Sequence, residues 1–152
     1  MPSRRSLLAA GIVMLAPAIA LAETRKGRFA DPQPGLDAPR KIVISLSEDD
    51  PKRIGAVLNN IVNIQKYYDA AFVRLAVVAY GPGIHAVLKD GNPVAGRIAS
   101  LQALDVEFIA CGATLETLGK SSADLLEDVA VVPNGLPEIV ERGLEGWIHL
   151  RP

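Results

Sequence analysis

From Lys41 to the C-terminus, apolar runs of strand length alternate with amphipathic stretches of helix length. This alternation predicts βαβ units, in which parallel strands are joined by helices. The run over 73–80 is continuously apolar after Arg74, which is typical of a central strand covered on both faces. The sequence therefore predicts an α/β domain with a mainly parallel sheet of about five strands. The expected strands are Lys41–Leu46, Val73–Tyr80, Val106–Ala110, Val129–Val132 and Trp147–Leu150.

Helices are expected between these strands, and the longest has the clearest start signal. Asp50 stands at the N-cap position and Pro51 at the first helical position, so Asp49 and Asp50 are better explained by helix capping than as an acid/base pair. A capping-box pattern over 121–124 predicts a further helical turn. The expected helices are Pro51–Tyr67, Ile84–Leu88, a helix from Gly91-Asn92-Pro93 through Leu104, and Pro137–Leu144.

The first 22 residues have the pattern of an export signal. Arg4 and Arg5 precede an apolar stretch that is too short for a membrane-spanning helix and that contains Pro17. The paired arginines match the bacterial twin-arginine pattern, and Ala20-Leu21-Ala22 matches a signal-peptidase site. We therefore expect a periplasmic protein that begins near Glu23 and has no membrane segment after cleavage. Residues 23–40 are rich in proline and charge and are expected to form an extended leader.

The remaining 130 of 152 residues suffice for one domain, residues 41–152, and are too few for two. Without Arg4 and Arg5 the 16 basic residues fall to 14, against 17 acidic residues, so the mature charge is −3. No basic block is present, which argues against a nucleic-acid partner. Cys111 is the only cysteine, so an internal disulfide is excluded.

Parallel strands have all their carboxyl ends at one edge of the sheet, so three turns are expected to meet there. Ligands of open α/β sheets bind in the crevice outside this edge. These turns are Ser47–Asp50, Gly81–His85 and Cys111–Thr114. Cys111 is the candidate reactive residue, since N–H groups at a helix start stabilise a thiolate. Gly112 and Ala113 would supply such groups. The alternative is a small buried hydrophobic residue, and position alone does not decide between the two.

His85 and the glycines before it have two interpretations each. His85 is either a proton acceptor for the thiol or hydrogen-bond donor to an anion, or a histidine satisfied at a surface turn. Gly81 and Gly83 are candidates for binding an anion through their amides, although Gly81-Pro82-Gly83 lacks the fuller dinucleotide-binding spacing and more often forms only a tight turn. No ligand spacing for a metal is present, and no cofactor is expected.

Four stretches, and a closing segment that also fits, resemble the DsrE/DsrF-like family, in particular its small single-domain branch. The likeness covers roughly Lys41 to the C-terminus. The stretches are Glu48-Asp49-Asp50-Pro51-Lys52, Leu58-Asn59-Asn60-Ile61, Val77-Val78-Ala79-Tyr80-Gly81-Pro82-Gly83-Ile84 and Val106-Glu107-Phe108-Ile109-Ala110-Cys111-Gly112-Ala113-Thr114-Leu115, with the closing segment from Val131 through Trp147.

The resemblance implies a three-layer α/β/α domain that forms small homo-oligomers. It also implies that Cys111 matches the family cysteine, which in some members carries sulfane sulfur as a persulfide. The leading hypothesis is a periplasmic sulfur-handling protein, a carrier or transferase, whose partners are a sulfur donor or acceptor protein. The alternative is a non-catalytic module that binds a small anion or assembles into oligomers, with a buried and inert Cys111.

Overall fold

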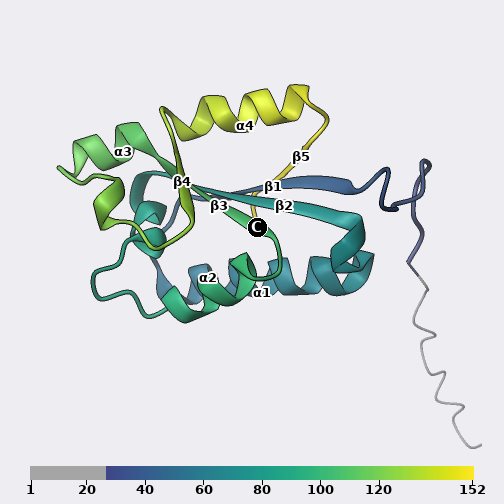
Figure 1. The fold of residues 1–152 in the computed structure, drawn as a ribbon, viewed down its shortest axis with the longest axis horizontal. Helices are drawn as coiled ribbons and strands as arrows, with labels where there is room; N and C mark the ends of the chain where they lie inside the picture. Colours follow the sequence, from purple (N-terminus) through teal and green to yellow (C-terminus); the bar gives the residue numbers. More distant parts are fainter. Residues whose placement is uncertain (1–26) are drawn as a thin grey trace, which may run out of the picture.

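Residues 27–152 are described by a computed structural model, in which a five-stranded sheet is covered by helices on both faces (Figure 1). All neighbouring strands are parallel, in the order β4-β3-β2-β1-β5. The predicted three-layer α/β/α fold with a parallel sheet is thus confirmed. The predicted export signal lies outside the described residues. The strands are β1 (Arg40–Leu46), β2 (Val73–Ala79), β3 (Val106–Cys111), β4 (Val129–Val132) and β5 (Ile148–Leu150).

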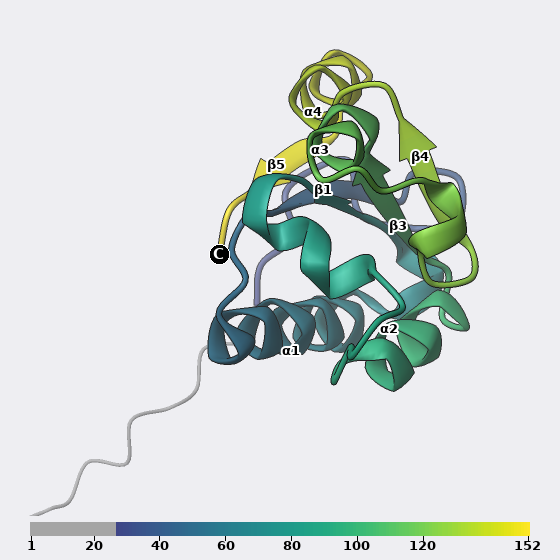
Figure 2. The same ribbon diagram turned by 90° about the vertical axis from the view of Figure 1, so that its left-hand side faces the viewer.

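The helices divide between the two faces according to the direction in which the chain crosses the sheet. From β1 to β4 each strand is added on the same side of the one before, so right-handed crossovers place the first two α-helices on one face. The last crossover runs back from β4 to β5 and places its helix on the opposite face, as the end-on view shows (Figure 2). The α-helices are α1 (Pro51–Tyr68), α2 (Ala95–Gln102), α3 (Gly112–Thr117) and α4 (Gly135–Leu144), and the 3₁₀ helices are η1 (Ala70–Phe72), η2 (Gly81–Val87) and η3 (Ser122–Asp124).

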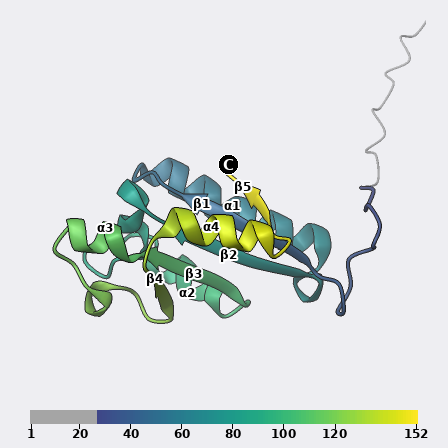
Figure 3. The same ribbon diagram turned by 90° about the horizontal axis from the view of Figure 1, so that it is seen from above.

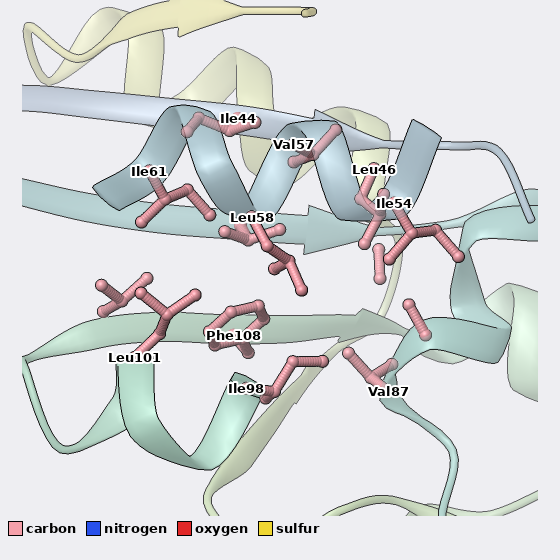
Figure 4. Close-up of a cluster of buried hydrophobic side chains, with 14 of the residues drawn as sticks. Ile44, Leu46, Ile54, Val57, Leu58, Ile61, Val87, Ile98, Leu101 and Phe108 are labelled. Carbon is pink, nitrogen blue, oxygen red and sulfur yellow. The ribbon is translucent and has the colours of Figure 1, made fainter. Parts of the chain in front are cut away.

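The larger hydrophobic core lies between the sheet and the helices α1 and α2 (Figure 4). Leu58 and Ile61 of α1 are fully buried there against the side chain of Phe108 from β3 and its neighbours. Burial of each such side chain stabilises the fold by roughly 1.5–3 kcal/mol. Asp50 is the N-cap of α1, and its carboxylate accepts a hydrogen bond from the Arg53 backbone N–H at 2.9 Å, which confirms the capping role predicted for Asp50. Asp49 is not the N-cap and lies at the carboxyl edge of the sheet instead.

A smaller core lies under α4, which runs lengthwise over the opposite face of the sheet (Figure 3). Ile139 fills its centre against inward side chains of β1, β2 and β3. Arg142 of α4 is only 14% exposed and joins Glu107 of β3 at 2.9 Å and Glu138 at 2.7 Å. Its guanidinium also lies 4.6 Å from the centre of the Trp147 ring. These contacts fix the position of α4 on the sheet.

Residues 27–39, the described part of the predicted leader, contain no helix or strand. They are nevertheless attached to the domain. Phe29 packs on Tyr67 and Tyr68 at the end of α1, with ring centres 5.3 and 5.5 Å apart. Arg40 donates a hydrogen bond to the carbonyl of Ala30 at 2.6 Å. The leader therefore begins its path along the amino-terminal end of the sheet, away from the carboxyl edge.

Candidate functional site

The candidate site lies at the carboxyl edge of the sheet, between the ends of β3 and β4. The connection that leaves β3 contributes Leu115 and Leu125 to the larger core, whereas the connection that leaves β4 places α4 over the smaller core on the opposite face. Connections that leave neighbouring strands toward opposite faces open a crevice at the sheet edge, and ligands of α/β proteins bind in such crevices. Cys111 is the last residue of β3 and therefore stands at this crevice.

A cleft of about 550 Å³ opens at this position. It is lined by residues at or just after the carboxyl ends of β1, β2, β3 and β4, as expected for a parallel sheet. Four of the predicted site residues line it, namely Cys111, His85, Gly81 and Ala113. The other lining residues are Asp49, Tyr80, Pro82, Thr114, Thr117, Leu118, Asn134 and Leu136.

Gly83 and Gly112, the two remaining predicted site residues, are not among the residues that line the cleft. Each of these glycines allows a neighbouring backbone segment to lie close to its own. A Cβ atom at Gly83 would overlap the carbonyl of Leu46 and lie 2.8 Å from the backbone nitrogen of Ser47. A Cβ atom at Gly112 would lie 3.0 Å from the carbonyl oxygen of Val132. The structure therefore gives both glycines a packing role in building the cleft.

Cys111 is buried, with 4% of its surface exposed, and it lines the floor of the cleft. It is also the N-cap residue of α3. Burial acts to raise the pKa of its thiol, because burial disfavours the charged form. Hydrogen bonds to the sulfur act in the opposite direction and outweigh burial, so the pKa of Cys111 lies below its ordinary value. These bonds come from the hydroxyl of Thr114 and the backbone N–H groups of Gly135, Thr114 and Ala113.

The hydroxyl of Thr114 makes the largest of these lowering contributions, and the fold orients it. The backbone N–H of Gly81 donates a hydrogen bond to Thr114 Oγ1 at 3.1 Å. This bond uses one lone pair of the oxygen and leaves the hydroxyl proton free to be donated to the sulfur of Cys111. Gly81 therefore contributes to the site through Thr114, a residue that the sequence did not indicate as functional.

The backbone N–H of Gly135, which follows β4 in the chain, makes the second contribution that lowers the pKa of Cys111. A Cβ atom at this position would lie 3.2 Å from Cys111 Cβ and 3.0 Å from Val78 Cγ1, so a side chain here would push these neighbours away by a few tenths of an ångström. The sequence signal that could have identified it is Asn134-Gly135 directly after β4, where Asn134 caps α4 by accepting a hydrogen bond from the Leu136 N–H.

His85 lies on η2, with an exposed side chain at the cleft wall. It does not contribute to the lowered pKa of Cys111, which has its causes in Thr114, Gly135 and Ala113. The structure thus brings His85 to the same cleft as the thiol but gives it no part in holding the thiolate. The second histidine, His149, lies on β5, where its Nε2 is 2.6 Å from the hydroxyl of the buried Ser45.

Within residues 27–152, no group of three or more metal-ligating side chains converges. No helix in that range is long and apolar enough to cross a membrane. The site is therefore defined by one buried thiol and the groups that hydrogen-bond to it.

The fold and the site define a class of protein: a small, parallel α/β domain with a single cysteine in a cleft at the carboxyl edge of its sheet. Comparison with known families agrees with this description. The profile of the DsrE/DsrF-like family matches residues 40–152, and the chain belongs to this family.

Two solved structures are similar to this chain. A protein of unknown function from Methanobacterium thermoautotrophicum, MTH1491, shares 35% sequence identity, with a TM-score of 0.71 over 74% of this chain and 99% of that one. The ychN protein of E. coli shares 18% identity, with a TM-score of 0.60 over the same fractions, which indicates a common fold. No curated protein matches the chain.

Proposed function

We propose that this protein binds or transfers sulfane sulfur, carried on Cys111 as a persulfide. The observation that supports this proposal is a buried thiol that opens to a cleft and whose pKa is lowered by hydrogen bonds to the sulfur. A thiolate is the nucleophilic form of cysteine and also the form that reacts with sulfane sulfur. A structural cysteine in an apolar core has a raised pKa instead. Membership of the DsrE/DsrF-like family, in which some members act in sulfur relay, agrees with this role.

Mass spectrometry of the intact protein tests the proposal. Reduced protein treated with polysulfide should gain the mass of one sulfur atom, and a reductant should remove it. Cys111→Ser is the control, since this chain has no other cysteine and the variant should gain nothing. Absence of the added mass in the wild-type protein would contradict the proposal.

The accessibility of the thiol distinguishes sulfur binding from the alternative function, a non-catalytic module with an inert cysteine. Only 4% of the Cys111 surface is exposed, and burial alone slows the reaction of a thiol with a reagent. Our proposal requires that a small alkylating reagent modifies the folded protein through the cleft. If modification occurs only after denaturation, the non-catalytic function is correct.

We propose that the protein carries out this function in the periplasm, which it reaches through the twin-arginine route. Arg4-Arg5 and Ala20-Leu21-Ala22 support it from the sequence. Replacement of both arginines by lysine should leave precursor in the cytoplasm, as detected by fractionation. The mature protein from wild-type cells should begin at or near Glu23. An unchanged periplasmic yield for the lysine variant would exclude the twin-arginine route.

A further inference from the structure

The charge of the cleft restricts which sulfur compound reaches Cys111. Among the described residues that line the cleft, none is lysine or arginine, and the one carboxylate is Asp49. Among the same residues, His85 is the one histidine. Tyr80, Pro82 and Leu136 contribute apolar surface. A bound oxyanion would therefore meet a carboxylate and a thiolate without a fixed positive charge.

Three of the backbone N–H groups at the cleft donate hydrogen bonds within the protein. The N–H of Gly81 donates to Thr114 Oγ1 at 3.1 Å, and that of Ala113 donates to the carbonyl of Pro133 at 3.0 Å. The N–H of Leu136 donates to the side chain of Asn134 at 3.4 Å. An oxyanion without lysine or arginine partners would need such groups free to point at it. Here their hydrogen bonds hold the cleft walls together.

We infer that the cleft selects an alkyl hydropersulfide, which carries at most one negative charge, over a dianionic sulfur oxyanion such as thiosulfate. The inference rests on the proposed function of Cys111. Apolar side chains at the rim favour an organic group, and the pair of negative charges at Asp49 and the thiolate repels a dianion. Leu118 and Leu136, 43% and 55% exposed, place this apolar surface where the organic group of the substrate would enter.

The reaction with such a donor is balanced without a further reagent. The thiolate of Cys111 attacks the terminal sulfur of R–S–SH, forming a new S–S bond while the S–S bond of the donor breaks. The terminal sulfur keeps its proton, so the products are the Cys111 hydropersulfide and the thiolate RS⁻, with one negative charge before and after. The attacking sulfur is oxidised as the departing sulfur is reduced, so no external oxidant or reductant takes part.

Rates of sulfur loading on the full protein test the selectivity. Benzyl hydropersulfide, which carries no fixed charge, and thiosulfate are compared by the gain of one sulfur mass. Each rate is divided by the rate of the same reagent with N-acetylcysteine amide, because the two donors differ in intrinsic reactivity. After this correction we expect the hydropersulfide to be favoured at least tenfold, with a smaller difference at high salt because salt screens the repulsion.

Three variants separate charge from other causes. Asp49→Asn should reduce the preference by removing a lining carboxylate, and Leu136→Lys should reduce it by adding a cation at the rim. Asp90→Asn, the same change at an exposed carboxylate outside the cleft, should leave it unchanged. Equal corrected rates for the two donors, or a preference insensitive to Asp49 and Leu136, would overturn this inference while leaving sulfur loading intact. Failure of both donors to load Cys111 would reject the proposed function, and this inference with it.

Discussion

Thr114 links the end of β2 to the cysteine, because its hydroxyl accepts a hydrogen bond from the Gly81 N–H and lowers the pKa of Cys111. Thr114→Val removes the hydroxyl at nearly constant volume. We expect the pKa of Cys111 to rise, because burial remains and the largest opposing contribution is lost. The alkylation rate measured against pH should show a midpoint below the free-thiol value of about 8.5 in the wild-type protein and a higher midpoint in the variant.

Thr117→Val is a matched control for that experiment. It makes the same chemical change one turn further along α3, still at the cleft, but the hydroxyl of Thr117 donates to the carbonyl of Ala113 instead of contributing to the thiol. Its alkylation midpoint should equal that of the wild-type protein. Equal midpoints for both threonine variants and the wild type would show that Thr114 does not hold the thiolate.

The lowered pKa of Cys111 also predicts a pH dependence of stability. Between the folded pKa and the ordinary thiol value the unfolded chain binds more protons than the folded chain, so the free energy of unfolding rises with pH. The contribution is complete above the ordinary thiol pKa and is lost as pH falls through the folded pKa. Urea denaturation of reduced wild-type protein and Cys111→Ser should show a difference that grows with pH across this window. A constant difference would indicate that the pKa is not lowered.

At the scale of elements, the start of η2 packs against the end of β1 and thereby places Gly81 and His85 at the cleft. The N–H of Tyr80 donates to the carbonyl of Leu46 at 3.1 Å, and Gly83 contacts the same backbone. Gly83→Ala should lower the free energy of unfolding by about 1–3 kcal/mol, because the added methyl group overlaps backbone atoms that cannot move independently.

Gly96→Ala is the control for that substitution. A Cβ atom at Gly96 meets no atom within 4 Å, and the residue lies within α2. This variant should be stabilised by roughly 0.5–1 kcal/mol, because alanine loses less conformational freedom in a helix than glycine. Chemical denaturation of both variants checks the pair, and a neutral effect of Gly83→Ala would show that the β1–η2 junction can open at little cost.

The strands and the long helix were predictable because their signals are local. Helix starts that are set by an asparagine side chain were harder to predict from the sequence. The helix predicted from Gly91-Asn92-Pro93 begins at Ala95. The side-chain amide of Asn92 donates hydrogen bonds to the carbonyls of Ala86 and Leu88 and thereby holds the chain in a turn. The helix predicted from Pro137 begins at Gly135, because Asn134 caps it. In both cases a side chain hydrogen bond decided the boundary.

The candidate site was predictable up to the edge of the sheet. A parallel sheet brings Cys111 and His85 to one edge whatever the order of its strands, so those residues were found. Gly135 and Leu136 reach Cys111 only because β4 lies next to β3 and the chain then crosses to the other face. Strand order is a tertiary property, and the local pattern of one sequence does not specify it.

At the scale of the whole molecule, α4 leaves one apolar stripe uncovered. Leu136, Val140 and Leu144 follow one another at intervals of four residues, which places them on one side of the helix, and they are 55%, 58% and 78% exposed. From the sequence alone, the asparagines of α1 (Asn59, Asn60 and Asn63) and Trp147 are the expected polar and aromatic contact residues of a homo-oligomer. Trp147 instead packs on the smaller core beneath Arg142. The stripe is therefore the better candidate for contact between subunits.

We propose that a second copy of the chain covers the part of this stripe outside the cleft, Val140 and Leu144, because a stripe of leucine and valine is complementary to itself across a two-fold axis. Leu144→Glu should then convert the oligomer to single chains, since a buried carboxylate without a partner opposes association. Thermal stability of the isolated chain should change little, because Leu144 is 78% exposed there. Leu36→Glu introduces the same charge at a leucine of similar exposure, 73%, away from α4, and should leave the molecular mass unchanged. Light scattering at micromolar concentration measures the mass. A wild-type protein with the mass of one chain, or an oligomer that persists in Leu144→Glu, would show that α4 does not form the interface.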